Sequence, residues 1–351
     1  MKRFIAVLLT LSMLTAMGLT LTACGSAETA EASATEFVLK PDGTPIRISW
    51  IGKTLNNPWW ISTADFAMRE AQALGVDMSI ALPQEEVDLE RQVAMVEAAI
   101  EQAVDAIIIS PVSSEGIIPV IQRARDAGII IVNFDTRISD PNMYDAFLGG
   151  DDVFGAYKAG VFIAEMLGGQ GEVGIITGLM AQSTGVDRHA GFMMAMEQYP
   201  GITVVAEATA EWRSDLAADV TAGILTANPN IQGIFASNDQ MAVGMVNAVL
   251  ASDRDIDDII LVGYDGILDA VDLMAAGQLD ALTALPNIEQ GANAVRIATA
   301  LILNPDYRFE RELIFDTPLV TVGYIPGLTD LTIYEFASIH FPFRGITDTG
   351  Y

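Results

Sequence analysis

The chain has 351 residues, 51% of them hydrophobic and 18% charged, which is enough apolar material for the cores of two domains of ordinary size. Its 46 acidic against 18 basic side chains give a formal net charge of −28 at pH 7, and with no basic stripe the sequence excludes nucleic acid as a partner. One cysteine excludes internal disulfides, and two histidines without a Cys/His cluster argue against a transition-metal site.

The first 24 residues have the organisation of an export signal. Lys2 and Arg3 precede an apolar run over residues 4–21, and small residues lead up to Cys24. The spacing resembles a bacterial lipobox, in which the cysteine becomes the lipidated first residue of the mature protein. The alternative is a single transmembrane helix, because the run approaches the ~20 residues that a bilayer requires. A plain span gives no reason for a cysteine where the small residues end, so we favour the lipid anchor.

The leader therefore predicts an exported protein held by lipid on the outer face of the cytoplasmic membrane, at the cell surface or in the periplasm. We expect a signal peptide at 1–23 and a lipid-anchored flexible tether over 24–44, whose Ala, Glu, Ser and Thr residues cannot form a core.

From residue 46 onward, short β-branched runs alternate with longer stretches of helical period. Near-continuous Val and Ile runs are typical of parallel strands buried on both faces, and strict strand and helix alternation indicates doubly wound α/β layers. The predicted strands are 46–51, 78–82, 106–109, 129–134, 173–177, 204–206, 233–236, 259–263 and 281–285. The predicted helices are 59–74, 87–102, 116–127, 154–167, 191–199, 216–226, 241–250, 268–276 and 288–303.

About 300 residues more often form two cores than one large sheet. The break is predicted at 148–152, where two glycines follow a strand, and a second crossing is predicted near 285–287. We expect an N-terminal lobe of 45–149 plus 286–317 and a C-terminal lobe of 150–285 plus 318–351.

Polar and aromatic residues follow the predicted strands, where doubly wound sheets bind their ligands. After the first strand, Asn57 suits a helix N-cap, and Trp59 and Trp60 point about 100° apart on the helix, so at least one is expected to line a cleft. After the fourth strand, the carboxylate of Asp135 and the guanidinium of Arg137 can hydrogen-bond to neighbouring hydroxyls of a ligand, although the two could instead form a surface ion pair.

The second half of the chain repeats this pattern. Asn238 and Asp265 each end an apolar run, and each could equally be an N-cap. Arg188 and Trp212, placed in matching loops, add a cation and an indole. Together these residues predict a polar cleft rimmed by aromatic side chains.

In this order the motifs resemble those of the ribose-binding protein and its relatives, the type I periplasmic sugar-binding proteins of ABC transporters. The similarity covers about residues 46–323 and rests on 54–60 (TLNNPWW), Phe134-Asp135, Arg188 ahead of Gly191-Phe192, 235–242 (FASNDQMA), 262–266 (VGYDG) and Leu285-Pro286.

The resemblance implies two Rossmann-like lobes joined by a three-strand hinge, with the ligand held between them by hinge closure. The family's sugar contacts fall on Asn57, Trp59, Trp60, Asp135, Arg188, Trp212, Asn238 and Asp265, and we add Lys53 and Arg137 as ligand-binding candidates.

Three departures from the ribose-binding pattern make ribose itself doubtful as the ligand. Lys53 replaces a serine, Thr136 replaces an arginine that moves one step to Arg137, and Ala284 replaces a glutamine. The lysine is similar to that of relatives that bind autoinducer-2 or deoxy-sugars. Asn287 and Gln290 are candidates for the missing amide, although both suit a helix start.

The resemblance implies a monomeric solute receptor that binds a monosaccharide and delivers it to an ABC transporter permease. The alternative is a receptor that presents its closed form to a chemoreceptor or sensor kinase. An enzyme is disfavoured because no Gly-x-Ser-x-Gly elbow, phosphate-binding loop or metal-ligand pattern is present, so we expect no catalytic residue, cofactor or metal. A transcription regulator would need a helix-turn-helix before residue 46, and we find none.

Overall fold

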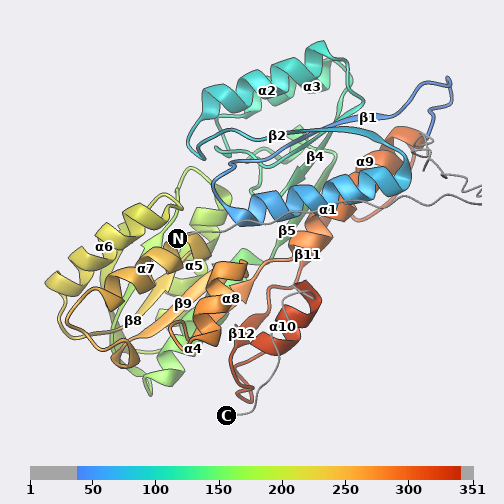
Figure 1. The fold of residues 1–351 in the computed structure, drawn as a ribbon. Helices are drawn as coiled ribbons and strands as arrows, with labels where there is room; N and C mark the ends of the chain where they lie inside the picture. The colour runs from blue at the N-terminus through green and yellow to red at the C-terminus, as the bar shows by residue number, and fades with distance from the viewer. Residues whose placement is uncertain (1–37, 341–351) are drawn as a thin grey trace, which may run out of the picture. The chain divides into compact units, whose positions relative to one another are not determined.

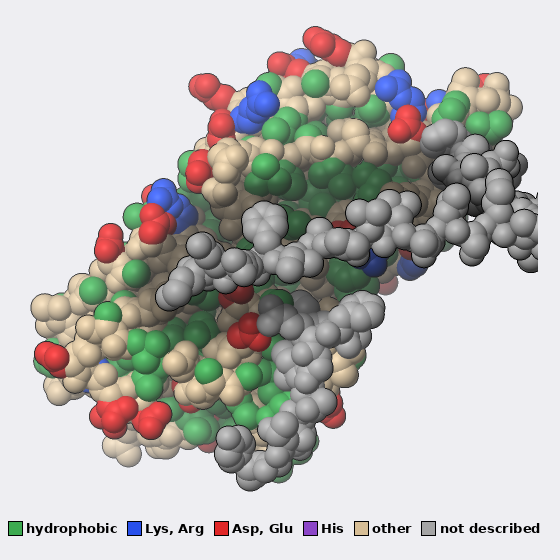
Figure 2. Space-filling model, in the orientation of Figure 1, with side chains coloured by type: hydrophobic (Ala, Val, Ile, Leu, Met, Phe, Trp, Pro, Cys, Tyr) green, Lys and Arg blue, Asp and Glu red, His purple; other side chains and the backbone are tan. Residues whose placement is uncertain are grey.

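The computed structural model describes residues 38–340 (Figure 1). The predicted signal peptide and Cys24 lie outside this range. None of the helices between residues 38 and 340 is both long and apolar enough to cross a membrane. Carboxylate side chains are scattered over the face drawn in Figure 2 with few Lys and Arg among them, as the net charge of −28 requires.

The first lobe is built on a six-stranded sheet in which every neighbouring pair is parallel. Helices α1 (Pro58–Leu74) and α9 (Asn287–Leu303) cover one face, and α2 (Leu89–Glu101) and α3 (Ile118–Asp126) cover the other (Figure 1). The strand order is β11 (Glu312–Phe315), β5 (Ala146–Gly150), β4 (Ile130–Phe134), β3 (Ala106–Ile109), β1 (Arg47–Ile51) and β2 (Asp77–Ala81).

Strand β3 shows why the sequence reads as a continuous apolar run. Ala106 and Ile108 pack into the core beneath α1 and α9, whereas Ile107 and Ile109 pack into the separate core beneath α2 and α3. All four side chains are fully buried, so a strand of this kind has no polar face.

The second lobe is built on a seven-stranded sheet that is parallel except between β10 and β12. Two close helix pairs, α4 with α5 and α6 with α7, pack against it. The strand order is β13 (Leu331–Thr332), β12 (Leu319–Thr321), β10 (Ala281–Ala284), β9 (Ile260–Asp265), β8 (Ile231–Ala236), β6 (Gln170–Thr177) and β7 (Gly201–Thr209). The helices of this lobe are α4 (Asp152–Met166), α5 (Ser183–Met196), α6 (Ser214–Ala227), α7 (Asp239–Leu250), α8 (Leu268–Ala275) and α10 (Ile333–His340), with a 3₁₀ turn at Ile256–Asp258. A second 3₁₀ turn, Pro141–Met143, lies between β4 and β5 of the first lobe.

The chain passes between the sheets three times, from β5 to α4, from β10 to α9 and from β11 to β12. Two α/β lobes with parallel sheets, the predicted fold class, are therefore confirmed.

Several boundaries differ from the sequence-based expectation. Lys40 forms an ion pair with Asp105 at 2.6 Å and Val38 donates to the Gly75 carbonyl, so residues 38–44 belong to the first lobe and the predicted tether is too long. Helix α5 begins at Ser183 rather than 191, because glycines and polar residues interrupt its apolar pattern. Strands β5, β11, β12 and β13 and helix α10 are not among the predicted elements. Strand β5 contains the two glycines that the sequence pattern places after a strand, β11 is a half-exposed edge strand, and β12 and β13 have only three and two residues.

Three glycines allow helices to meet backbone to backbone. A Cβ atom at Gly191 in α5 would lie 2.0 Å from the Val153 carbonyl oxygen of α4, and a Cβ at Gly244 in α7 would lie 2.0 Å from the Ser214 oxygen of α6. In the first lobe, a Cβ at Gly291 in α9 would lie 2.5 Å from a carbonyl oxygen of α1. These separations are too short for any side chain, so each helix pair depends on its glycine.

We predict that Gly244→Ala lowers the free energy of unfolding by about 1–3 kcal/mol, because the added methyl group forces α6 and α7 apart. Gly223→Ala is the matched control: it lies in α6 with open space around the new Cβ, and it should raise stability by up to ~1 kcal/mol through helix propensity. Urea unfolding followed by circular dichroism measures both. Equal shifts in the two variants would contradict the close approach.

Candidate functional site

A pocket lies between the two lobes at the carboxyl ends of the strands, and we call it the central pocket. Nine of the ten predicted ligand-binding residues line it. Its lining consists of Lys53, Asn57, Trp59, Trp60, Glu86 and Asp135 from the first lobe, Thr184, Arg188, Trp212, Asn238 and Asp265 from the second, and Leu285 at a crossing between them.

The start of α1 supplies the aromatic wall. Asn57 is its N-cap and accepts from the Trp59 backbone N–H at 2.9 Å, so the cap itself orients the first helical turn. The Trp59 and Trp60 rings meet edge to face with centroids 4.8 Å apart, and both side chains are only 3% exposed. Both indoles therefore line the pocket although their directions differ by about 100° along the helix.

Lys53 lies at the centre of a buried polar cluster in the first lobe. Its Nζ donates to Thr136 Oγ1 and to Gln182 Oε1, the latter at 2.8 Å. It also forms ion pairs with Asp135 Oδ2 at 3.3 Å and Glu86 Oε1 at 3.5 Å. An ammonium group has three N–H donors, and four protein acceptors already surround this one. Lys53 therefore organises its neighbours and has no free donor for a ligand.

Asp135 follows β4 with a φ of 57°, in the left-handed region that aspartate tolerates better than most residues. Its Oδ2 accepts from Ser110 Oγ and Thr136 Oγ1 at 3.2 Å as well as from Lys53. These contacts hold one edge of the carboxylate, and the other oxygen is left for the pocket.

Arg188 is the central cation of the second lobe, and it is only 3% exposed. Its Nε donates to Asp152 at 2.9 Å, and its Nη1 donates to the Ser237 carbonyl at 2.7 Å and to Asp265 at 3.1 Å. The guanidinium also lies 3.9 Å from the centre of the Tyr264 ring. Two flanking carboxylates raise the pKa of Arg188, so it stays charged while its Nη2 remains unused.

Asp265 ends β9 with a φ of 124°. The turn after it is held by Asp239, whose Oδ2 accepts from the backbone N–H groups of Gly266 and Ile267. Burial raises the pKa of Asp265 to about 7, and the charges of Asp135 and Asp152 add to the effect while Arg188 opposes it. The carboxyl therefore titrates near neutral pH.

Trp212 and Asn238 complete the second-lobe wall. Trp212 sits between β7 and α6 with a φ of 64°, and its Nε1 donates to Gln182 Oε1 at 3.0 Å. Asn238 is the N-cap of α7, where its Oδ1 accepts from the Met241 N–H at 2.8 Å. The capping role and the place in the pocket thus coexist in one residue.

The hydrogen bonds made within residues 38–340 leave a defined set of groups unused around the pocket. The donors are Asn57 Nδ2, Trp59 Nε1 and Arg188 Nη2, and the acceptors are Asp135 Oδ1 and Asp265 Oδ2. Asn238 Nδ2 makes only a long contact of 3.5 Å. Both lobes therefore present unused donors and acceptors, which suit a ligand whose groups both donate and accept hydrogen bonds.

Arg137 is the one predicted ligand-binding residue that does not line the central pocket. Its guanidinium forms an ion pair with Glu312 of β11 at 2.9 Å and stacks 3.8 Å from the Phe147 ring centre. Arg137 follows Asp135 by two residues, and its side chain lies against the edge strand β11 and Phe147 rather than in the pocket. Arg188 is also not on a loop as predicted but within α5.

The sequence analysis did not predict four residues of the site. Glu86, Thr184 and Leu285 line the pocket, and Gln182 accepts a hydrogen bond from the pocket residue Lys53. Glu86 lies on the long loop after β2, where no strand end marks it. Burial raises the pKa of Glu86 while the charge of Lys53 opposes the shift. Asn287 and Gln290 do not line the pocket; Asn287 begins α9 and donates to Ser62.

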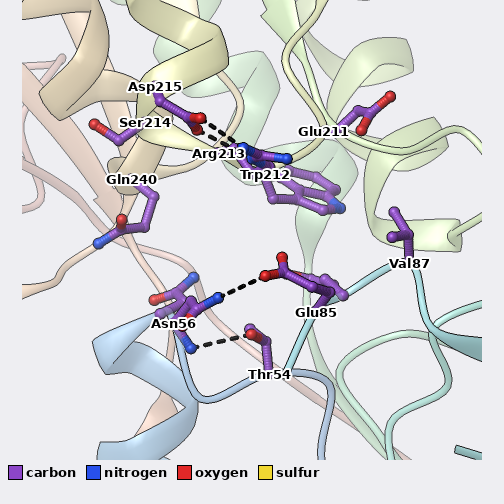
Figure 3. Close-up of a pocket in the computed structure, with 12 residues that line it drawn as sticks. Thr54, Asn56, Glu85, Val87, Glu211, Trp212, Arg213, Ser214, Asp215 and Gln240 are labelled. Carbon is purple, nitrogen blue, oxygen red and sulfur yellow. Dashed lines mark hydrogen bonds and ion pairs between the residues drawn. The ribbon is translucent and has the colours of Figure 1, made fainter. Parts of the chain in front are cut away.

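A second hollow, which we call the vestibule, adjoins the central pocket and shares Asn57, Glu86 and Trp212 with it. Figure 3 shows Thr54, Asn56 and Glu85 of the first lobe facing Trp212, Arg213 and Asp215 of the second across this hollow. Arg213 is paired with Asp215 and Glu86 with Lys53, so Glu85 and Glu211 leave the vestibule negative.

Known proteins share both the sequence pattern and the fold. The family model described as "Periplasmic binding protein domain" matches residues 48–305. A D-ribose/D-allose-binding protein of Pseudomonas aeruginosa is 30% identical over 310 residues, which are 86% of this chain and 95% of that protein. The D-allose-binding periplasmic protein of Escherichia coli is 33% identical over 252 residues, covering 70% of this chain and 81% of that one.

Two solved structures extend the comparison. An ABC transporter periplasmic solute binding protein from Actinobacillus succinogenes with bound D-allose has a TM-score of 0.73 and 33% identity, covering 79% of this chain and 97% of that one. The fructose-binding periplasmic domain of a hybrid two-component system has a TM-score of 0.74 and 26% identity, covering 79% and 90%. The ordered motifs, the two lobes and the matches over most of both chains lead to one conclusion: this chain belongs to the type I periplasmic sugar-binding proteins.

Proposed function

We propose that this protein captures a monosaccharide in the central pocket and delivers it to an ABC transporter permease. The observation that supports the proposal is the set of unused donors and acceptors that both lobes direct into one buried pocket. Each sugar hydroxyl both donates and accepts, so adjacent hydroxyls match carboxylate oxygens beside guanidinium and amide N–H groups. The indoles of Trp59, Trp60 and Trp212 offer apolar faces to the C–H groups of a sugar ring.

The ligand drives closure because it binds the closed form better, by touching both lobes at once. Asn57, Trp59 and Asp135 act from the first lobe, and Arg188, Asn238 and Asp265 act from the second. Lys53 contributes by fixing the Asp135 carboxylate rather than by touching the sugar. The negative vestibule disfavours sugar phosphates and sugar acids, so the expected ligand is uncharged.

We also propose that Cys24 carries a lipid and holds the mature monomer on the outer face of the cytoplasmic membrane. The support is the lipobox-like sequence up to Cys24 together with the extracytoplasmic location of the family. The sugars named for the relatives include ribose, allose and fructose, which agrees with an importer ligand of monosaccharide size.

A second candidate function is ligand sensing, in which the closed form is presented to a chemoreceptor or sensor kinase. The solved fructose-binding domain of a two-component system favours it, because that domain has the same fold and serves a sensor. Autoinducer-2 belongs with the sugars among the ligands of this alternative.

We predict that Asp135→Asn and Asp265→Asn each weaken sugar binding about 10- to 150-fold, because a hydrogen bond to a charged group contributes about 1.5–3 kcal/mol. Asparagine keeps the volume and tolerates the left-handed φ at both positions. Calorimetric titration of the mature protein with pentoses, hexoses, deoxy-sugars and autoinducer-2 identifies the ligand and then measures the variants.

Asp126→Asn, on the exposed end of α3, is the control and should bind normally. Arg188→Ala is less informative, because it leaves Asp152 and Asp265 buried without a counter-charge at a cost of about 3–5 kcal/mol. Wild-type affinity in both asparagine variants would rule out the central pocket as the sugar site.

We further predict that affinity falls as pH drops below 7. In the ligand-free protein the pKa of Asp265 is about 7, and a sugar hydroxyl that donates to the ionised carboxylate lowers the pKa in the complex. Below about pH 7 the free protein therefore holds a proton that sugar binding releases. Affinity should decrease up to about tenfold from pH 7.5 to 6, with proton release measurable by titration in buffers of different ionisation enthalpy.

Asp187→Asn should retain this pH dependence, because Asp187, whose pKa burial raises to about 6, lies outside the central pocket. Asp265→Asn should abolish the dependence in whatever binding remains. An affinity that does not change across this pH range would show that Asp265 does not accept from the ligand.

A further inference from the structure

A strip of direct hydrogen bonds joins the lobes beside the central pocket. The Ser114 N–H donates to the Ala181 carbonyl at 2.9 Å, and the Ser183 N–H donates to Ser114 Oγ at 3.0 Å. The Arg137 N–H donates to Ser183 Oγ at 2.8 Å, and the hydroxyls of Thr136 and Thr184 lie 3.1 Å apart. These four contacts favour the arrangement in which the two lobes lie against each other.

Gln182 lies in the middle of this strip and is completely buried. Its Oε1 accepts from Lys53 Nζ of the first lobe at 2.8 Å and from Trp212 Nε1 of its own lobe at 3.0 Å. Its Nε2 donates to the Val112 carbonyl of the first lobe at 3.2 Å. The Gln182 amide therefore joins Lys53 of the first lobe to Trp212 of the second, and both of these residues line the pocket.

We propose that Gln182 is a positioning residue that couples closure of the lobes to assembly of the sugar site, an inference that rests on the proposed function. When the lobes separate, Gln182 loses Lys53 and Val112. Lys53 then loses one of the acceptors that hold it against Asp135, so the ammonium fixes the carboxylate less firmly, although Ser110 and Thr136 still donate to it. The site is complete only in the closed form.

The hydrogen bonds of this strip also set how often the ligand-free protein closes. Apparent affinity equals the affinity of the closed form multiplied by the fraction of molecules that are closed. A group that favours closure without touching the sugar therefore tightens binding by raising that fraction.

The test is Gln182→Met, which keeps the side-chain length and removes the amide. We expect small-angle X-ray scattering of the ligand-free variant to show a larger radius of gyration than the wild type, because the two hydrogen bonds that join Gln182 to the first lobe are gone. Saturating sugar should restore the closed radius. Calorimetric affinity for the sugar identified above should fall at least about tenfold.

Gln92→Met is the matched control. Gln92 is equally buried and makes three hydrogen bonds, to Gly52, Ser110 and Val112, all inside the first lobe. This variant should lower the melting temperature without changing the ligand-free radius. Gln182→Glu is the second variant, because it keeps the acceptor for Lys53 and Trp212 but loses the donor to Val112, and its radius should fall between those of the wild type and Gln182→Met.

A wild-type radius in ligand-free Gln182→Met would overturn the proposal, whatever its affinity. The scattering measurement uses no sugar, so it separates a failure of this inference from a failure of the proposed function. Equal radius changes in Gln182→Met and Gln92→Met would also overturn it, because they would reflect general loosening.

Discussion

The site depends on one buried ionic arrangement, the Arg188 guanidinium held between Asp152 and Asp265. Its Nε and Nη1 donate to the protein, whereas its Nη2 makes no hydrogen bond to any group between residues 38 and 340. Because a buried cation is costly without partners, the carboxylates fix both its charge and its direction. The same contacts leave Asp265 with one free oxygen beside the free N–H groups. The hydrogen-bonding groups that face the central pocket therefore follow from how the protein pairs its own buried charges.

Backbone conformation supplies the second part of this preorganisation. Asp135, Trp212 and Asp265 all have positive φ angles, and all three project from strand ends or the loops after them into the central pocket. Such conformations cost free energy and persist only where the surroundings hold them. Asp239 does so for the turn after Asp265 by accepting two backbone N–H groups. The backbone strain of these three residues thus lies at the central pocket, where their side chains converge.

The sequence predicted what depends on local pattern and motif order. Buried strands such as β3 were found because both faces are apolar, and the residues at strand ends were found because parallel strands end at one edge. Arg137 was misplaced because sequence adjacency to Asp135 does not fix side-chain direction. Gln182 and Glu86 were missed because their roles arise from contacts with distant residues, Lys53 above all, and no local pattern carries that information.

The three crossings between the sheets impose an order of assembly during synthesis. Helix α1 packs on α9, which begins more than two hundred residues later, and β5 pairs with β11, which is later still. The first lobe therefore cannot finish folding until the second has been made, and the apolar surface of α1 waits uncovered in the meantime. Transiently exposed apolar surface of this kind favours aggregation, so the late position of α9 in the chain makes completion of the first lobe the vulnerable step of folding.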